Sequence, residues 1–313
     1  MREYLATFLK GFAMGAANVV PGVSGGTIAL ITGIYQRLID ALKSFDVGAL
    51  KLLCGFRIGD LWRKIDGSFL LSLGLGVVAS IFSLAKVLKW GFAEHPTLVW
   101  SLFFGLIAAS IPSIGKMIKK WTLAVVVLFL AGMSLAVSMA FLTPASEDTG
   151  TVYLGFCGVA AMCSMIIPGL SGSFVLLLMG NYELVALDTI NALRAGDFGE
   201  ALPVLIPVAV GAVVGLLALS RLLSWLFSHH HDKAMGAITG FVAGSLVIIW
   251  PWKDTLTEQF EKGGEVKEKI VGYENWRFPD VASGVFWLQL AALVAGVLII
   301  VGVEIVAKRN SKS

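Results

Sequence analysis

Long apolar runs dominate the chain and alternate with short polar stretches. Runs close to the roughly 20 residues that a helix needs to cross a bilayer lie at 68–92, 97–115, 121–141, 201–228, 234–251 and 284–306. Two further apolar regions, 4–36 and 152–190, are each interrupted once by a Pro-Gly-x-Ser-Gly sequence. The pattern therefore predicts an all-α integral membrane protein with single spans and two broken segments.

The interruptions leave helical arms that are too short to cross a bilayer alone. At 1.5 Å per residue, the arms 10–21 and 24–37 would be about 16 Å and about 20 Å long, near half the hydrocarbon thickness. A re-entrant hairpin that enters and leaves on one side fits these lengths. Two tilted full spans are the alternative, which the longer arm before Pro168 favours. Either arrangement returns the chain to its starting side.

The number of spans between the two breaks predicts an inverted repeat. Three single spans separate them, so the two hairpins are expected to enter from opposite faces. Residues 1–141 would form the first repeat, a hairpin plus three spans. Residues 142–313 would form the second, inverted repeat, with a polar external loop at about 252–283. Inverted repeats with broken helices are typical of secondary transporters, whose sites lie where the repeats meet.

Matching residues at a constant offset support a duplication. Residues 21–36 align with 168–183 without a gap, and at a second offset "LAKVLKW" (84–90) matches "LSRLLSW" (219–225). The paired positions are Pro21/Pro168, Gly22/Gly169, Ser24/Ser171, Gly25/Gly172, Gly33/Gly180, Tyr35/Tyr182, Lys86/Arg221, Trp90/Trp225 and Gly105/Gly240.

Composition agrees with a membrane protein and excludes several other classes. Hydrophobic residues make up 57%, charged residues only 14%, and the mean hydropathy is +0.84, whereas a soluble domain has about 25% charged residues. A net charge of +3 is too small to indicate a nucleic-acid partner. The three cysteines form no disulfide framework, and we expect no metal and no cofactor. Glu3 and Lys10 distinguish the first segment from a signal peptide, so we expect it to stay in the mature protein.

Lysine and arginine are unevenly distributed between the two predicted sides. The external loop 252–283 contains more acidic than basic residues. By the positive-inside rule, both termini are predicted to be cytoplasmic. The basic residues on that side are Arg37, Lys43, Lys51, Arg57, Arg63, Lys64, Lys116, Lys119, Lys120, Lys308, Arg309 and Lys312.

The residues after each Pro-Gly suit an anion. Serine caps helix starts, glycine lets a ligand approach the backbone, and the first turn presents free N–H groups. Two such starts facing each other near the midplane would suit a substrate with one phosphate. The alternative is that these small residues only allow close helix packing. The predicted site residues of the two breaks are Ser24, Gly25, Gly26, Thr27, Ser171, Gly172 and Ser173.

A basic pair and two weaker polar residues are further candidates for the same site. Lys86 and Arg221 lie inside apolar segments at equivalent repeat positions, where an ionisable side chain indicates function. Both also lie near segment ends, so snorkelling to the interface is the alternative. Asn18, just before the first break, and Glu183, after the second, are the weaker candidates.

The paired motifs "PGVSGGTIALITGIY" and "PGLSGSFVLLLMGNYE" resemble those of the polyprenyl-phosphate transporter family. The resemblance covers nearly the whole chain. It implies a multi-pass protein of the bacterial inner membrane that returns undecaprenyl phosphate from the outer to the cytoplasmic leaflet, with a phosphate-bearing prenyl lipid as its partner. Only the seven motif positions in the two breaks are carried over as site residues.

Two other functions are alternatives. Undecaprenyl-pyrophosphate phosphatases have a similar loop, Pro-Gly-x-Ser-Arg-Ser, with a glutamate-rich partner motif. Here Gly25 and Gly172 take the arginine position, and no Glu-x-x-x-Glu lies in an apolar segment. Hydrolysis would lack groups to stabilise charge and transfer protons, so we expect no enzymatic activity and no catalytic residue. A secondary transporter for a small soluble anion would use the same machinery.

Overall fold

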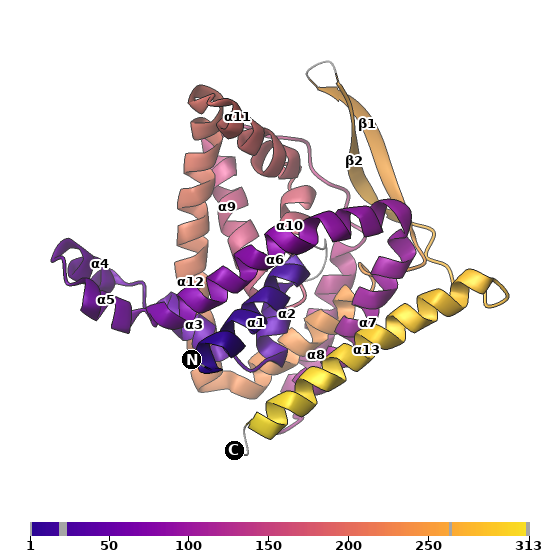
Figure 1. Cartoon of the computed structure of the whole chain (residues 1–313), viewed down its shortest axis with the longest axis horizontal. Helices are drawn as coiled ribbons and strands as arrows, with labels where there is room; N and C mark the ends of the chain where they lie inside the picture. The colour runs from indigo at the N-terminus through magenta and orange to yellow at the C-terminus, as the bar shows by residue number, and fades with distance from the viewer. Residues whose placement is uncertain (1, 19–23, 263–264, 311–313) are drawn as a thin grey trace.

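The computed structural model describes residues 2–18, 24–262 and 265–310 and is mostly helical (Figure 1). Among its apolar helices, α8 (Leu123–Met139) and α9 (Thr151–Ile166) are slightly shorter than a membrane span. The predicted helical membrane protein is therefore confirmed. The helices long and apolar enough to cross a bilayer are α6 (Gly67–Glu94), α7 (Pro96–Gly115), α12 (Phe198–Ser245) and α13 (Gly284–Asn310).

The runs predicted at 201–228 and 234–251 form the two halves of α12. The helix is interrupted at His230, whose φ of −138° and ψ of 41° are not helical. Figure 1 shows α12 descending from α11 (Thr189–Ala195) and then turning sharply. A kink thus replaces the short polar connection between two spans.

Four helix pairs form the frame of the molecule, and glycines lie at each crossing. Helix α1 (Arg2–Asn18) packs on α6, α9 on the first half of α12, α7 on α13, and α8 on the second half of α12. A Cβ added at any of these glycines would overlap a backbone carbonyl of the opposing helix, as small-residue crossings in membranes require. The glycine and carbonyl pairs are Gly11/Leu73, Gly211/Gly155, Gly105/Leu293 and Gly240/Phe129.

The first broken segment reverses direction. Helices α2 (Gly25–Ile31) and α3 (Tyr35–Lys43) follow the break, and Arg37 in α3 pairs with Glu3 at the start of α1 at 2.9 Å. Arg37 also pairs with Asp66 at 2.7 Å, just before α6. The chain therefore returns to the end of α1 from which it started.

The second broken segment reverses in the same way. Helix α10 (Gly172–Leu178) follows its break, and next come a π-helix, η1 (Leu184–Asp188), and α11. Asn181 exchanges two hydrogen bonds with the main chain of Asp148, at 2.7 and 3.0 Å, just before α9.

The two copies also end their short helices alike. Gly33 and Gly180 have φ of +71° and +76°, the left-handed conformation that favours glycine. In each copy the next amide bonds back five residues, from Ile34 to Ala29 and from Asn181 to Leu176, both at 3.0 Å. This is the glycine-terminated helix end known as a Schellman motif.

The predicted external loop contains regular structure, so the expectation of an all-α chain was wrong there. Strands β1 (Asp254–Lys262) and β2 (Glu265–Glu274) pair in antiparallel fashion, with a bulge between Leu256 and Thr257. Threonine, valine, isoleucine and aromatic residues among the charges favour strands, and the two runs flank a Gly-Gly pair in the sequence. The basic stretch 37–66 likewise holds two short helices, α4 (Val47–Cys54) and α5 (Ile58–Lys64).

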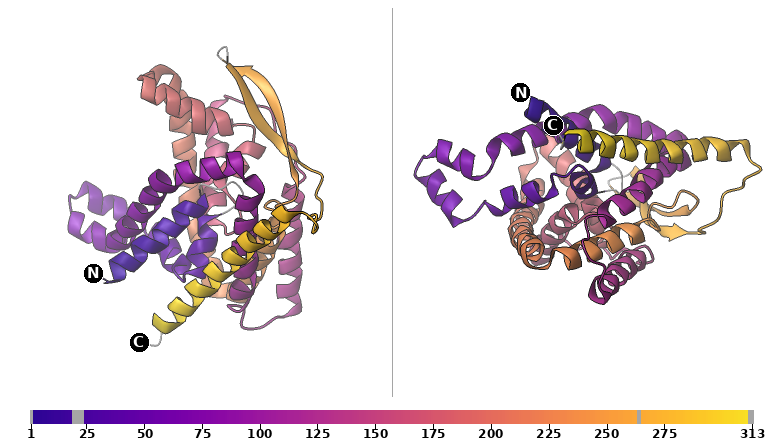
Figure 2. Two further views of the ribbon diagram at one scale, coloured as in Figure 1. Left: turned by 45° about the vertical axis from the view of Figure 1, so that its right-hand side comes forward. Right: turned by 90° about the horizontal axis from the view of Figure 1, so that it is seen from below.

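The start of α1 and the end of α13 lie at the same end of the molecule (Figures 1 and 2). The β-hairpin projects from the opposite end (Figure 1). The basic and acidic connections of the sequence therefore lie at different ends of the helical body.

Candidate functional site

The two breaks, far apart in the sequence, meet inside the molecule. The Ser24 hydroxyl donates to the carbonyl of Ile167 at 3.2 Å, and the amide of Gly169 donates to Thr27 Oγ1 at 2.9 Å. A third bond runs from the Tyr35 hydroxyl to the carbonyl of Ile166 at 3.0 Å. The structure thus joins Ser24 and Thr27 of the first break to the residues that precede Ser171 in the second break.

This junction is buried and tightly packed. Ser24 and Thr27 are 1% and 0% exposed, so their hydroxyls are shielded from solvent. A Cβ at Gly26 would lie 2.7 Å from the carbonyl oxygen of Ile166, which leaves no room for a side chain. Gly169 has φ of +88° and passes against Val242 of α12. Glycine is therefore required on both sides of the junction, by space at one position and by conformation at the other.

In the first break, the first-turn amides of α2 are bonded within the protein. Gly25 N donates to Asn18 Oδ1 at 2.8 Å, Gly26 N to Ser24 Oγ at 3.1 Å, and Thr27 N to Ser24 O at 3.1 Å. Asn18, predicted as a weak candidate, is thus a capping residue in this conformation. An anion would reach the amides of Gly25 and Gly26 only by displacing a side-chain acceptor.

The second break is built differently at the same positions. Ser171 makes no capping bond to α10; its hydroxyl instead pairs with that of Ser173 at 2.7 Å. Met165 occupies the place that Asn18 has in the first copy, since a Cβ at Gly172 would contact its side chain. A thioether is a weak acceptor. The amide of Gly172 consequently lacks the side-chain cap that Gly25 has.

The predicted basic pair is not brought to the junction by the described side chains. Arg221 is exposed and donates to the carbonyl of Leu217, one turn earlier in its own helix, at 3.2 Å. Lys86 lies in α6, and its side chain is outside the described residues. A different cation, Lys10, lies on the inner side of α1 and donates to the carbonyl of Thr32 at 2.8 Å. Lys10 follows no repeat pattern, so the duplication did not point to it.

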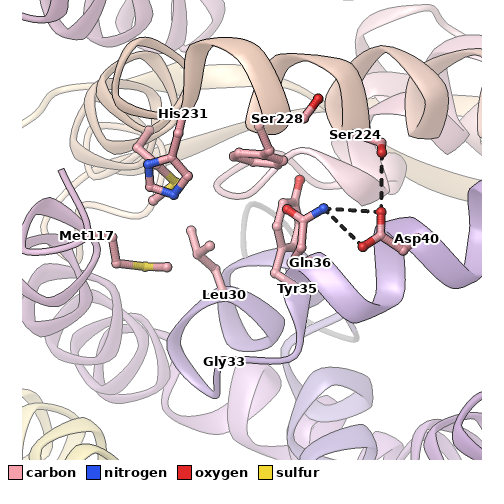
Figure 3. A pocket seen from close by; sticks show the side chains of 11 residues that line it. Leu30, Gly33, Tyr35, Gln36, Asp40, Met117, Ser224, Ser228 and His231 are labelled. Carbon is pink, nitrogen blue, oxygen red and sulfur yellow. Dashed lines mark hydrogen bonds between the residues drawn. The ribbon is translucent and has the colours of Figure 1, made fainter. Parts of the chain in front are cut away.

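A cavity of about 470 Å³ adjoins the junction (Figure 3). Tyr35, whose hydroxyl bonds the second break, forms part of its wall. Gln36 and Asp40 line it from α3, Ser224 lies opposite Asp40 on α12, and His231 lies farther along α12, on the side of Met117 (Figure 3). Sequence reasoning found Tyr35 only as a repeated position and did not select the other four.

A polar bridge joins the two walls of this cavity. The Ser224 hydroxyl donates to Asp40 Oδ1 at 3.2 Å, and Lys43 Nζ donates to Ser224 Oγ at 3.1 Å. Gln36 also donates to both carboxylate oxygens of Asp40, at 3.2 Å each. Helices α3 and α12 are thus held together by side chains at the mouth of the cavity.

Comparison with known proteins places this chain in a family. The sequence of residues 14–267, a stretch that contains both breaks, matches the protein family described as VCA0040-like, undecaprenyl phosphate translocase-like. The chain belongs to this family. No solved structure matches the chain at a significant level.

Two relatives of this chain carry the same functional name. A polyprenyl-phosphate transporter of Vibrio cholerae serotype O1 is 36% identical over 311 residues, covering 98% of both chains. A polyprenyl-phosphate transporter of Staphylococcus aureus is 29% identical over 255 residues, covering 78% of this chain and 85% of its own. The resemblance predicted from the paired motifs is therefore confirmed.

Proposed function

We propose that the protein carries polyprenyl phosphate across the bacterial inner membrane, from the outer to the cytoplasmic leaflet, without hydrolysing it. The observation that carries this proposal is the contact between the two breaks through Ser24, Thr27 and Tyr35. Two interrupted segments that meet in the interior offer polar groups where lipid would offer none. The names of the two relatives supply the substrate class.

The groups at the junction suit reversible binding of one phosphate. Within the described residues, the hydroxyls of Ser171 and Ser173 bond only each other, so both can turn towards a ligand. The amides of Gly25 and Gly26 are held by side chains that can swing away. Helices of about two turns have little dipole, so these individual donors, rather than a helix field, would hold the phosphate. Neutral donors bind moderately and therefore release their ligand.

An inverted repeat supports an alternating-access mechanism. The two hairpins have the same helix ends, and the helix pair α1/α6 corresponds in chain order to α9/α12. The cavity beside Tyr35 lies among residues near the basic connections, on the side assigned to the cytoplasm. In this conformation the junction would be reached from the cytoplasmic side. Rocking of the repeats would break the bonds from Ser24 and Thr27 and open the other side.

Reconstitution into vesicles tests this function. Purified protein should move a fluorescent polyprenyl phosphate between leaflets and release no inorganic phosphate from polyprenyl pyrophosphate. Ser24→Ala should slow transport about tenfold, the loss expected for buried hydrogen bonds that are removed together. Ser138→Ala in α8 is the matched control, because that hydroxyl is exposed and bonds only Leu135 O.

Two outcomes would reject the proposal. Steady phosphate release that disappears in Ser24→Ala would indicate a phosphatase. Uptake of radioactive inorganic phosphate, with no movement of the lipid, would indicate a transporter for a soluble anion.

A further inference from the structure

A second, apolar cavity lies next to α2, between helices that belong to different pairs. It has a volume of about 190 Å³ and is formed by α1, α2, α7 and α13. Because α1 packs on α6 while α13 packs on α7, it occupies the seam between these two pairs. The residues that matter here are Ala13, Ala17, Ile28, Phe103, Ile300 and Val303.

The seam opens towards the surrounding bilayer. Ala13 on α1 and Ile299 on α13 both line the cavity and are exposed. Figure 2 shows α13 along the outside of the helical body in the view from below. Alanines on α1 leave space opposite the larger aliphatic residues of α13. An apolar chain could therefore enter from the side without crossing a polar surface.

One cation lies at the end of this seam. Lys10 is on the same stripe of α1 as Ala13 and Ala17, at spacings of three and seven residues. Its ammonium group donates to the carbonyl of Thr32, and Thr32 itself lines the seam. An ammonium has three donors, so two remain for another acceptor.

Nothing among the described residues neutralises this cation. Arg37, a like charge that repels the ammonium group, is itself paired with Glu3 and Asp66, and no described carboxylate pairs with Lys10. The bond from Lys10 to the Thr32 carbonyl caps the end of α2. A neutral donor could make the same bond, so capping alone does not account for a positive charge at this position. A half-buried cation within an apolar segment indicates an anionic ligand.

We propose that this seam binds polyprenyl phosphate in the cytoplasmic half of the membrane, with the phosphate on Lys10 and the first isoprene units between α1 and α13. The cavity is smaller than the 300–1,000 Å³ of pockets for drug-sized ligands, so most of the tail stays in lipid. The inference rests on the proposed function, and it assigns a lateral seat for the lipid that is distinct from the junction.

Photolabelling locates the tail directly. The probe is a prenyl phosphate with a diazirine in its second isoprene unit, added to the full-length protein in phosphatidylcholine nanodiscs. Adducts should fall on peptides of α1, α7 or α13. Adducts confined to α8 and the second half of α12 would overturn the proposal, and so would a pattern that excess phosphatidylglycerol abolishes as well as excess farnesyl phosphate does.

Variants separate the head from the tail. Lys10→Gln should weaken binding of farnesyl phosphate about tenfold and leave farnesol binding unchanged, since one charge-assisted contact is lost. Lys10→Arg should restore most of the affinity. Ala13→Trp, which fills the seam, should weaken both ligands and shift the photolabel away. The controls are Lys116→Gln and Ala124→Trp, both at exposed positions outside the seam.

The outcomes distinguish this inference from the proposed function. If wild-type protein transports the phosphate lipid and Lys10→Gln and Ala13→Trp do so at the same rate, the seam is not on the route and the function stands. If the wild type neither binds nor transports the lipid, the proposed function itself fails.

Discussion

Ser24 joins two distant parts of the chain with one hydroxyl group. The hydroxyl accepts from the amide of Gly26 and donates to the carbonyl of Ile167. One donor and two acceptor positions are what a hydroxyl offers, so both bonds form at once. Ser24, predicted from the sequence as a helix cap, thus also connects the two breaks.

Gly26 gives a sharp test of that contact. Gly26→Ala should abolish transport, because the new Cβ would lie 2.7 Å from the carbonyl oxygen of Ile166 and push the breaks apart. Gly25→Ala should be milder, since its Cβ meets only the movable side chain of Asn18. Gly74→Ala in α6 has open space and is the control. The measurement is the flipping rate in vesicles; equal rates for all three variants would contradict the arrangement.

The buried side chain of Lys253 should make the stability of the protein depend on pH. It is 9% exposed, donates to the Trp250 carbonyl at 2.9 Å, and lies over the rings of Trp100 and Tyr273. Burial lowers the pKa of Lys253 from 10.5 to about 7, although the ring faces attract the ammonium form. Between these values the unfolded chain holds a proton that the folded chain lacks, so stability should rise as pH increases from 7 to 10.5.

The comparison for Lys253 is the variant Lys253→Met. The difference in thermal midpoint between wild type and variant should change in favour of the wild type as the pH is raised. A difference that stays constant from pH 7 to 10 would show that the folded and unfolded chains hold this proton equally.

Many residues of the candidate site were predictable from the sequence, but the hydrogen bonds that join them were not. Duplication pointed to Ser24 and Ser171 because a local motif repeats in the sequence. That Thr27 bonds Gly169 depends on how the halves pack, which no local pattern encodes. Lys10 was predictable only as an ion in an apolar run, since its partner Thr32 comes near only when the hairpin reverses.

At the scale of elements, glycine crossings fix which helices pair. Gly240→Ala should lower the stability of the protein by about 1–3 kcal/mol, because its Cβ would overlap the carbonyl of Phe129 in α8 and no rotamer can relieve this. Gly302→Ala in α13 meets nothing within 4 Å and should leave the thermal midpoint in detergent unchanged or slightly raised. Equal midpoints for the two variants would show that the crossing tolerates a methyl group.

The spans were predictable from hydropathy because length and apolarity alone decide membrane insertion. The β-hairpin was missed because charges on both strands obscure the alternation that identifies a strand. The kink in α12 was predicted as a short connection, since five polar residues from 229 to 233 interrupt the apolar pattern without a helix breaker.

For the whole molecule, the inverted repeat expected from the sequence makes a testable prediction about the sides on which the connections lie. Native Cys54 is exposed in α4 and can serve as the label on the basic side once Cys157 and Cys163 are replaced by serine. In intact cells a membrane-impermeant maleimide should miss Cys54 and label Thr149→Cys, which is exposed before α9. Labelling of both from outside would place the two hairpins on one side and refute the inversion.

The hydrogen bonds across the junction also bear on the order in which the chain is made. The amides that start α2 are bonded by Asn18 and Ser24, groups that leave the ribosome at nearly the same time. The first hairpin can therefore wait in lipid without unpaired amides at that helix start, which hydrocarbon does not tolerate. The later segment contributes Ile166, Ile167 and Gly169, whose bonds across the junction go to residues synthesised long before. The N-terminal half thus provides the surface on which the second break packs. We expect the C-terminal half, expressed alone, to lack partners for these bonds.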